Sequence, residues 1–125
     1  MAVLSGIPVL NCQSIEATLE FYQQLLHFVV VKKRDLNGTL YWAHLMNGDT
    51  TLMLQSADQQ HSLVAPQQQS NISLYFFVND LKELHHFIKA KNNHVSDVKV
   101  TDYKMQEFSL TDPEGNTIII GMADR

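Results

Sequence analysis

The spacing of apolar residues along the first 56 positions changes from strand-like to helical and back. Residues 4–10 form a short apolar run with β-branched members, which is typical of a strand. Over 15–26 the apolar residues recur at helical spacing, and Ser14 is a candidate N-cap. Asn37-Gly38 predicts a tight hairpin, because both residues tolerate positive φ. Three apolar runs in this region are predicted strands: 28–32, 40–46 and 51–55.

The second half of the chain repeats this order. Residues 72–78 form an apolar strand-like run. Asp80 and Glu83 have the spacing of a capping box, which predicts the start of a second helix. The last turn is predicted at 112–116, where Pro, Gly and Asn are gathered. Three more strands are predicted at 95–100, 104–111 and 117–121.

The two halves align without a gap at an offset of 66 residues, the distance from Ile7 to Ser73. Helix starts, hairpins and last strands all coincide at this offset, which indicates two copies of one supersecondary unit. The predicted fold class is α+β, with two βαβββ modules in one domain. The module boundaries are 4–56 and 71–125, and a Gln-rich linker separates them at 57–70.

Charge and composition limit the classes of binding partner that we expect for this protein. The net charge is −4 and no dense run of Lys or Arg occurs, so nucleic acid is not expected as a partner. The short cluster at 32–34 is interpreted as the solvated end of a strand. A single cysteine, Cys12, cannot form an internal disulfide, which favours a reducing cytoplasm. We see no signal peptide and no apolar run of membrane-spanning length, so no membrane association is expected.

Two motifs resemble one known family. Ile7-Pro8-Val9-Leu10 precedes a helix containing Phe21-Tyr22, and residues 112–116 read Asp-Pro-Glu-Gly-Asn. Together they resemble the glyoxalase/bleomycin-resistance/extradiol-dioxygenase superfamily, also called the vicinal oxygen chelate superfamily. The resemblance implies curled mixed sheets around a cleft, helices on the outer face, and frequent homodimers.

The resemblance also implies where a metal would be held. Metal-using members place ligands on the first and last strand of each module. Alignment on the two motifs puts these residues there: Ile7, Met53, Ser73 and Ile119. None of these is a suitable ligand for a divalent transition metal, which prefers imidazole, carboxylate or thiolate. We therefore expect neither a metal nor another cofactor, and the chain is most similar to the metal-free bleomycin-resistance-like branch.

Strand alternation predicts which side chains line the cleft. Ala43 and Leu45 suit packing under a helix, so Trp42 and His44 are assigned to the cleft. The 66-residue offset then assigns Phe108 to it as well. The predicted ligand-binding residues are Asn11, Trp42, His44, Met53, Gln55, Tyr75, Phe77 and Phe108. The alternative is that several of these aromatic residues belong to the core.

Binding without turnover is the leading hypothesis for function. An apolar, aromatic cleft with few polar groups is typical of a small-molecule pocket. No catalytic residue is assigned, because His44 has no visible acid or base partner. We expect a dimer that sequesters a planar or apolar small molecule, as bleomycin-resistance-like members do. Two alternatives stay open: a divergent lyase, isomerase or dioxygenase-family enzyme using His44 or Tyr75, and a module that binds a peptide or protein.

Overall fold

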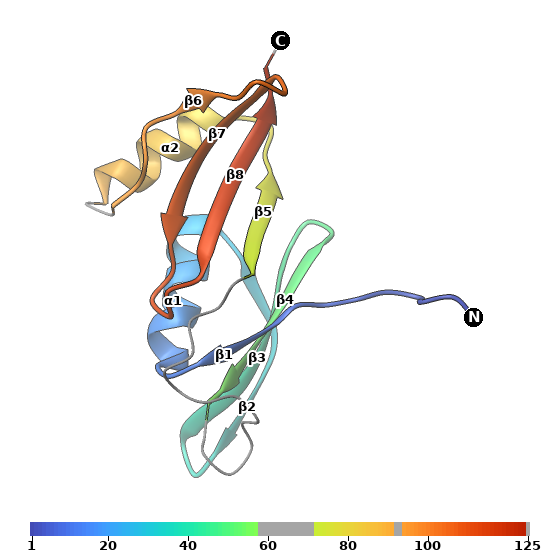
Figure 1. The fold of residues 1–125 in the computed structure, drawn as a ribbon. Coiled ribbons are helices and arrows are strands. Elements are labelled where there is room, and N and C mark those ends of the chain that lie inside the picture. Colours follow the sequence, from blue (N-terminus) through green and yellow to red (C-terminus); the bar gives the residue numbers. More distant parts are fainter. Residues whose placement is uncertain (58–71, 92–93, 125) are drawn as a thin grey trace. The chain divides into compact units, whose positions relative to one another are not determined.

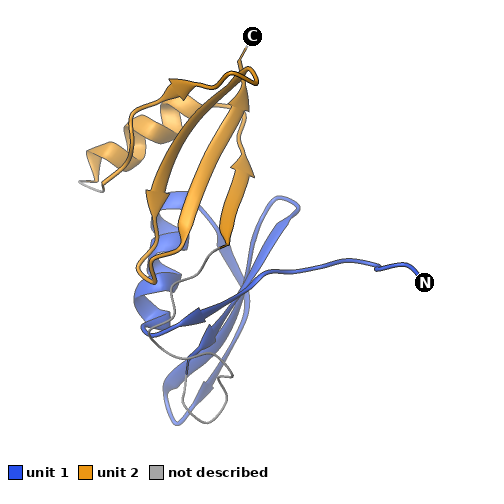
Figure 2. Cartoon of the chain, viewed as in Figure 1, with its two compact units in different colours: residues 1–68 blue, residues 69–125 orange. Residues whose placement is uncertain are grey.

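The computed structural model describes residues 1–57, 72–91 and 94–124, which fall into two compact units. Unit one is Met1–Gln68 and unit two is Gln69–Arg125 (Figure 2). Of the predicted linker at 57–70, only Ala57 belongs to the described residues. Within the described part of the chain, no helix is long and apolar enough to cross a membrane.

Unit one consists of a four-stranded mixed sheet and one helix (Figure 1). The strands lie in the order β1-β4-β3-β2, with β1 parallel to β4 and the other neighbours antiparallel. The predicted βαβββ order is confirmed, although the first strand begins at Val9 rather than at Leu4. The elements are β1 (Val9–Cys12), α1 (Ile15–Leu26), β2 (Val29–Leu36), β3 (Thr39–Asn47) and β4 (Thr50–Ser56).

The core of unit one lies between α1 and one face of its sheet. Tyr22 of the helix is fully buried, because the apolar positions of α1 recur on the side that packs against β3 and β4. Alternate residues of the two strands meet the helix and are fully buried: Ala43, Leu45, Leu52 and Leu54. The residues between them therefore point to the opposite face of the sheet. We call that face the distal face of unit one.

Unit two repeats this plan. Its strands lie in the order β5-β8-β7-β6, with β5 parallel to β8 and the other neighbours antiparallel. Asp80 caps the helix as predicted, since its carboxylate accepts a hydrogen bond from the backbone N–H of Glu83 at 3.2 Å. The elements are β5 (Ser73–Phe77), α2 (Leu81–Ala90), β6 (Lys99–Val100), β7 (Met105–Thr111) and β8 (Thr117–Ala123). The α+β class and the repeated βαβββ order are thus confirmed.

The predicted strand at 95–100 is shorter in the structure. Only Lys99 and Val100 form β6, and Val95 makes an isolated bridge to Leu110. Ser96 accounts for the difference, because its hydroxyl oxygen accepts a hydrogen bond from the Ser109 N–H at 2.8 Å. This side chain occupies a backbone donor of β7 that would otherwise be available to a neighbouring strand.

The gapless alignment of the two halves is wrong by one residue. The offset is 66 between β1 and β5 and between β4 and β8, as the pairs Val9↔Met53 and Tyr75↔Ile119 show. It falls to 65 between β3 and β7, because the equivalent hairpin pairs are Met46↔Thr51 and Thr111↔Thr117. The second hairpin therefore encloses one residue more than the first. A shift of one residue turns every side chain of β7 to the other face.

Candidate functional site

The distal face of unit one gathers most of the predicted ligand-binding residues. Trp42 and His44 alternate with the buried residues of β3, so the face predicted for them is confirmed. The strand pairing arranges the side chains in two cross-strand rows. One row is Arg34, Trp42, Gln55 and Asn11, and the other is Lys32, His44, Met53 and Val9. Their binding of a ligand stays a prediction.

Polar and aromatic contacts link the first row. The guanidinium carbon of Arg34 lies 5.6 Å from the centroid of the Trp42 ring, within the range of a cation–π contact. The side-chain amide of Gln55 donates a hydrogen bond to the Asn11 side-chain oxygen at 3.2 Å. These contacts place an indole ring between a cation and a pair of amides. Flat aromatic molecules can stack on such a surface and hydrogen-bond at its rim.

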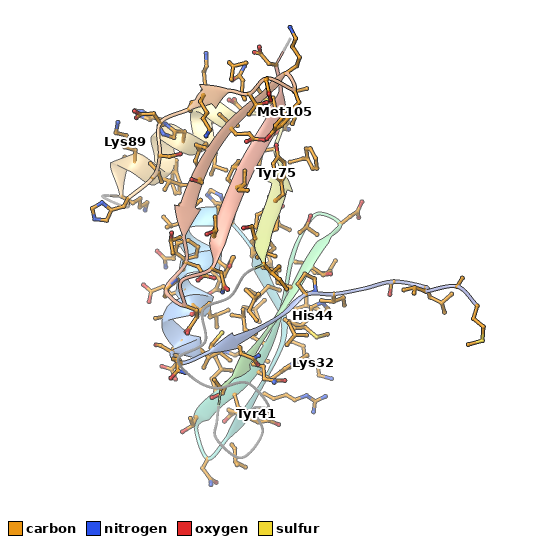
Figure 3. All side chains as sticks on the ribbon, viewed as in Figure 1. Lys32, Tyr41, His44, Tyr75, Lys89 and Met105 are labelled. Atoms are coloured by element: carbon orange, nitrogen blue, oxygen red, sulfur yellow. The ribbon has the colours of Figure 1, made fainter. Side chains whose placement is uncertain are left out.

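His44 provides the polar group of the second row. Its ring centroid lies 6.3 Å from that of Trp42, and its register partner on β2 is Lys32 (Figure 3). The Nε2 atom of His44 is buried and has no hydrogen-bond partner among the described residues. A buried polar atom without a partner is costly, so Nε2 of His44 is an unfavourable feature of this face.

The distal face of unit two, turned away from α2, carries a cluster around one carboxylate. Tyr75 and Phe77 of β5 point to this face, and their ring centroids lie 4.9 Å apart. The hydroxyls of Tyr75 and Tyr103 both donate hydrogen bonds to Oε2 of Glu107, each at 2.7 Å. Glu107 is only 6% exposed. The two phenols thus compensate part of the cost of burying this carboxylate.

The same contacts change the acidity of both phenols. Burial, together with the hydrogen bond to Glu107 and its negative charge, raises the pKa of Tyr75 to about 12. The hydrogen bond to Glu107 also raises the pKa of Tyr103. Both phenols therefore stay protonated near neutral pH and act as donors. A tyrosine of this kind is a poor general base.

Gly121 of β8 makes room for the Tyr75 ring. A Cβ atom at this position would overlap the Tyr75 hydroxyl and the neighbouring ring carbons. Gly121 is also the register partner of Glu107. The absence of a side chain at Gly121 therefore allows the Tyr75 hydroxyl to reach the carboxylate.

Phe108 lies on the opposite side from the one predicted. It is 1% exposed, and its ring packs edge-on against the His85 ring of α2 at a centroid distance of 4.9 Å. The cause is the extra residue in the second hairpin, which turns Glu107 and Ser109 to the distal face instead. Phe108 is therefore a core residue beneath the helix, and its assignment to the cleft is wrong.

Four residues of these two faces are not among the predicted ligand-binding residues. Arg34 and Lys32 belong to the cluster that the sequence predicts as a solvated strand end, and no sequence motif includes Tyr103. Glu107 is not predicted from the sequence either. Its strand, β7, mixes three apolar residues with Gln106, Ser109 and Thr111, so no apolar pattern marks the Glu107 carboxylate as buried.

A separate cavity of about 670 Å³ lies in unit two, on the side of the sheet that faces α2. Its lining residues are Val78, Asn79, Gln106, Met122 and Ala123. Gln106 donates a hydrogen bond from Nε2 to Asp124 at 3.0 Å, while its Oε1 is buried without a partner among the described residues. None of the predicted ligand-binding residues lines this cavity. The residues predicted to bind a ligand therefore lie outside this cavity.

Two mixed sheets of βαβββ order, each covered by a helix on one face, define the class of protein. Residues 6–120 match the family model described as Glyoxalase/Bleomycin resistance protein/Dioxygenase superfamily. The chain belongs to this superfamily, as the two motifs indicated. No curated protein matches the chain in sequence. The superfamily's description includes both enzymes and resistance proteins, so membership alone does not decide the activity.

Solved structures share the fold at low sequence identity. TioX from Micromonospora sp. ML1 has a TM-score of 0.78 at 12% identity, over 95% of this chain and 99% of that chain. TnmS3, an antibiotic binding protein from Streptomyces sp. CB03234, has a TM-score of 0.73 at 14% identity, over 99% of this chain and 100% of that chain. A bleomycin resistance determinant encoded on the transposon Tn5 has a TM-score of 0.74 at 21% identity, over 98% of this chain and 100% of that chain. At these identities the likeness shows the fold alone.

Alignment on the two motifs assigns the superfamily's metal positions to two isoleucines, a methionine and a serine: Ile7, Ile119, Met53 and Ser73. Aliphatic and hydroxyl side chains do not bind the divalent ions that imidazole and carboxylate hold, and a lone thioether prefers Cu(I). Across residues 1–57, 72–91 and 94–124, no three His, Cys, Asp or Glu side chains lie together in a group that could hold a metal ion.

Proposed function

We propose that this protein binds a small molecule without a metal and sequesters it, using the aromatic distal faces of its two units. The observation that carries the proposal is the first row of unit one. Trp42 lies between the Arg34 guanidinium and the Gln55–Asn11 amide pair, on the face that α1 leaves uncovered. His44 and Met53 in the second row, and Tyr75 and Phe77 in unit two, complete the proposed ligand-binding residues. A planar or apolar molecule suits these surfaces.

The known relatives support a binding role in general terms. One structural neighbour is described as an antibiotic binding protein and another as a bleomycin resistance determinant. Binding is favoured over catalysis because neither candidate catalytic residue is equipped for proton transfer. Tyr75 has a raised pKa of about 12, and His44 has no acid or base partner among the described residues.

Trp42 is the only tryptophan, so its fluorescence tests the proposal directly. Phenazine, a neutral planar probe, should quench or shift this emission on titration. Trp42→Ala should weaken phenazine binding by about 1–3 kcal/mol and leave a folded protein, because a residue that stacks on a ligand contributes chiefly to affinity. Isothermal titration calorimetry measures the affinity, and thermal unfolding measures the stability.

Tyr41→Ala is the matched control. Tyr41 precedes Trp42 on β3, is 43% exposed and points to the other face of the sheet (Figure 3). Its removal should leave phenazine affinity unchanged. If phenazine leaves the emission of Trp42 unchanged, and Trp42→Ala costs about 3–5 kcal/mol of stability, then Trp42 belongs to the core and the proposal is wrong.

Metal independence has its own test. The purified protein should contain no stoichiometric divalent metal, because the side chains at the superfamily's metal positions are not suitable ligands. Elemental analysis by mass spectrometry after dialysis measures the metal content, and phenazine titration with and without EDTA measures its relevance. About one tightly held transition metal per chain would contradict this part of the proposal.

A further inference from the structure

The distal face of unit two combines a buried carboxylate with exposed aromatic rings. Glu107 is 6% exposed, whereas Phe77 is 76% and Tyr103 is 61% exposed. Exposed aromatic rings normally find a partner or are scattered singly. Here Tyr103 contacts the acidic group directly, and Phe77 packs against Tyr75, which also contacts it. The arrangement depends on Gly121, because a side chain at that position would displace the Tyr75 ring from Glu107.

Among the described residues, Glu107 forms no ion pair with a cation. Its two hydrogen bonds, from Tyr75 and Tyr103, both end on Oε2 and come from neutral groups. Lys99 is its register partner on β6, but the two residues form no ion pair in the described part of the chain. The Lys99 side chain is exposed, so its ammonium group can stay hydrated. A carboxylate has lone pairs for more acceptor contacts than the two phenols use.

We propose that the distal face of unit two binds organic ammonium groups, with Glu107 supplying the opposite charge and the rings of Tyr75, Phe77 and Tyr103 supplying cation–π contacts. The inference rests on the proposed function, since it names a ligand class for one of the two faces. A cation over an aromatic face is attracted by the ring quadrupole, and the attraction grows when the site loses water. A charged carboxylate beneath the rings adds to that attraction.

Desolvation explains why a neutral ligand is disfavoured here. A ligand that contacts Glu107 removes its remaining exposure to water, since the residue is only 6% exposed. Burying a carboxylate further without a compensating charge or donor is costly. A neutral apolar ligand therefore loses part of the binding free energy that its apolar contacts provide. A cationic ligand recovers this loss, and an anionic ligand is repelled.

A metal cation is a poor alternative occupant. The phenols of Tyr75 and Tyr103 donate protons to Glu107, and their raised pKa keeps them protonated near neutral pH. A protonated phenol is a weak ligand for a metal ion, so Glu107 is the single carboxylate ligand at this site. Ca²⁺ and Mg²⁺ need several oxygen ligands. The rings and one carboxylate suit an alkylammonium group instead.

Choline and its neutral isostere 3,3-dimethylbutan-1-ol form a matched pair of probes, because they differ in charge but hardly in shape. Each is titrated into the full-length protein and followed by backbone amide shifts in two-dimensional NMR spectra. Choline should shift resonances of β5 and β7 in a saturable manner. The alcohol should bind about tenfold more weakly or not at all.

Glu107→Gln should lower choline affinity by about tenfold, because it removes the charge but keeps an oxygen that accepts from the phenols. Glu20→Gln is the control, since it makes the same change in net charge on the exposed side of α1. If Glu107→Gln fails to fold, Phe77→Leu tests the contribution of the aromatic rings to choline binding instead. Phe77 is largely exposed, so its replacement should preserve the fold and weaken choline binding by about threefold.

Equal binding of choline and the alcohol, or choline shifts that Glu107→Gln and Phe77→Leu leave unaltered, would overturn the inference. The phenazine titration separates this result from failure of the proposed function. If phenazine quenches Trp42 while choline does not bind unit two, the ammonium site is wrong and the binding function stands. If choline binds and phenazine does not, the ammonium site stands and the proposed role of Trp42 is wrong.

Discussion

At the residue scale, Oε2 of Glu107 joins two segments of unit two. Tyr75 belongs to β5, Tyr103 precedes β7, and both hydroxyls meet the same oxygen at 2.7 Å. Charge-assisted hydrogen bonds of this kind are roughly twice as strong as neutral ones. Three side chains therefore hold one another in place on a face that presents aromatic rings outward.

The Tyr75 hydroxyl predicts how stability depends on alkaline pH. Its pKa is raised to about 12, above the value of about 10 for an unfolded chain. The protonated phenol thus contributes stability that is fully present below about pH 10 and is lost as the pH rises from about 10 to 12. Thermal unfolding between pH 8 and 12 should show a steeper decline for the wild type than for Tyr75→Phe.

Tyr41→Phe provides the comparison for this titration. Tyr41 is an exposed tyrosine of unit one, so its replacement should leave the alkaline decline as steep as in the wild type. Ultraviolet absorbance of phenolate gives a second readout, since Tyr75→Phe should remove a step with a midpoint near pH 12. Parallel stability curves for the wild type and Tyr75→Phe would show that the hydroxyl is not coupled to folding.

At the element scale, the hairpin between β7 and β8 sets which residues reach the distal face of unit two. Asp112 is 4% exposed, and its Oδ1 accepts hydrogen bonds from the backbone N–H groups of Glu114 and Asn116 at 2.9 Å each. Its Oδ2 accepts from the Asn116 side chain at 2.9 Å. Gly115 adopts a φ of 87°, which favours glycine. This turn holds the extra residue that brings Glu107 to the face.

Removing the carboxylate that holds this turn should destabilise the protein. Asp112→Ala leaves two backbone donors and one amide without their partner, and we expect a loss of about 1–3 kcal/mol. Chemical denaturation measures the loss. Asp49→Ala, in the exposed turn of the equivalent hairpin, should change stability by less than about 0.5 kcal/mol. Similar losses in the two variants would mean that the Asp112 hydrogen bonds contribute little.

At the scale of the whole molecule, we predict a homodimer. Each unit exposes large apolar side chains, among them Val29 and Val31 in unit one and Ile72 and Val100 in unit two. Isologous pairing of two copies is the commonest way to cover such surfaces. Light scattering coupled to size-exclusion chromatography should give twice the mass of one chain at micromolar concentration. The mass of a single chain under these conditions would contradict the prediction.

The sequence alone was sufficient to predict both helices, the βαβββ order and the face of β3 on which Trp42 and His44 lie. The helical spacing over 15–26 and the capping box at Asp80 depend on residues close in sequence, and both helices form as predicted. Alternation along β3 placed Trp42 and His44 on the face away from α1, because the period of a strand is a local property. The two motifs were specific enough to identify the superfamily.

Only the tertiary structure decided which residues of β7 reach the distal face. Strand register depends on how many residues a hairpin encloses, and the turn after Thr111 holds one more than its counterpart in unit one. That single residue sends Phe108 to the core and Glu107 to the face. Tyr75 lies 32 positions from Glu107 in sequence. The hydrogen bond between them forms because β5 and β7 both pair with β8, where Gly121 leaves room for the Tyr75 ring. No local pattern contains this contact, because it exists only once β5, β8 and β7 have paired.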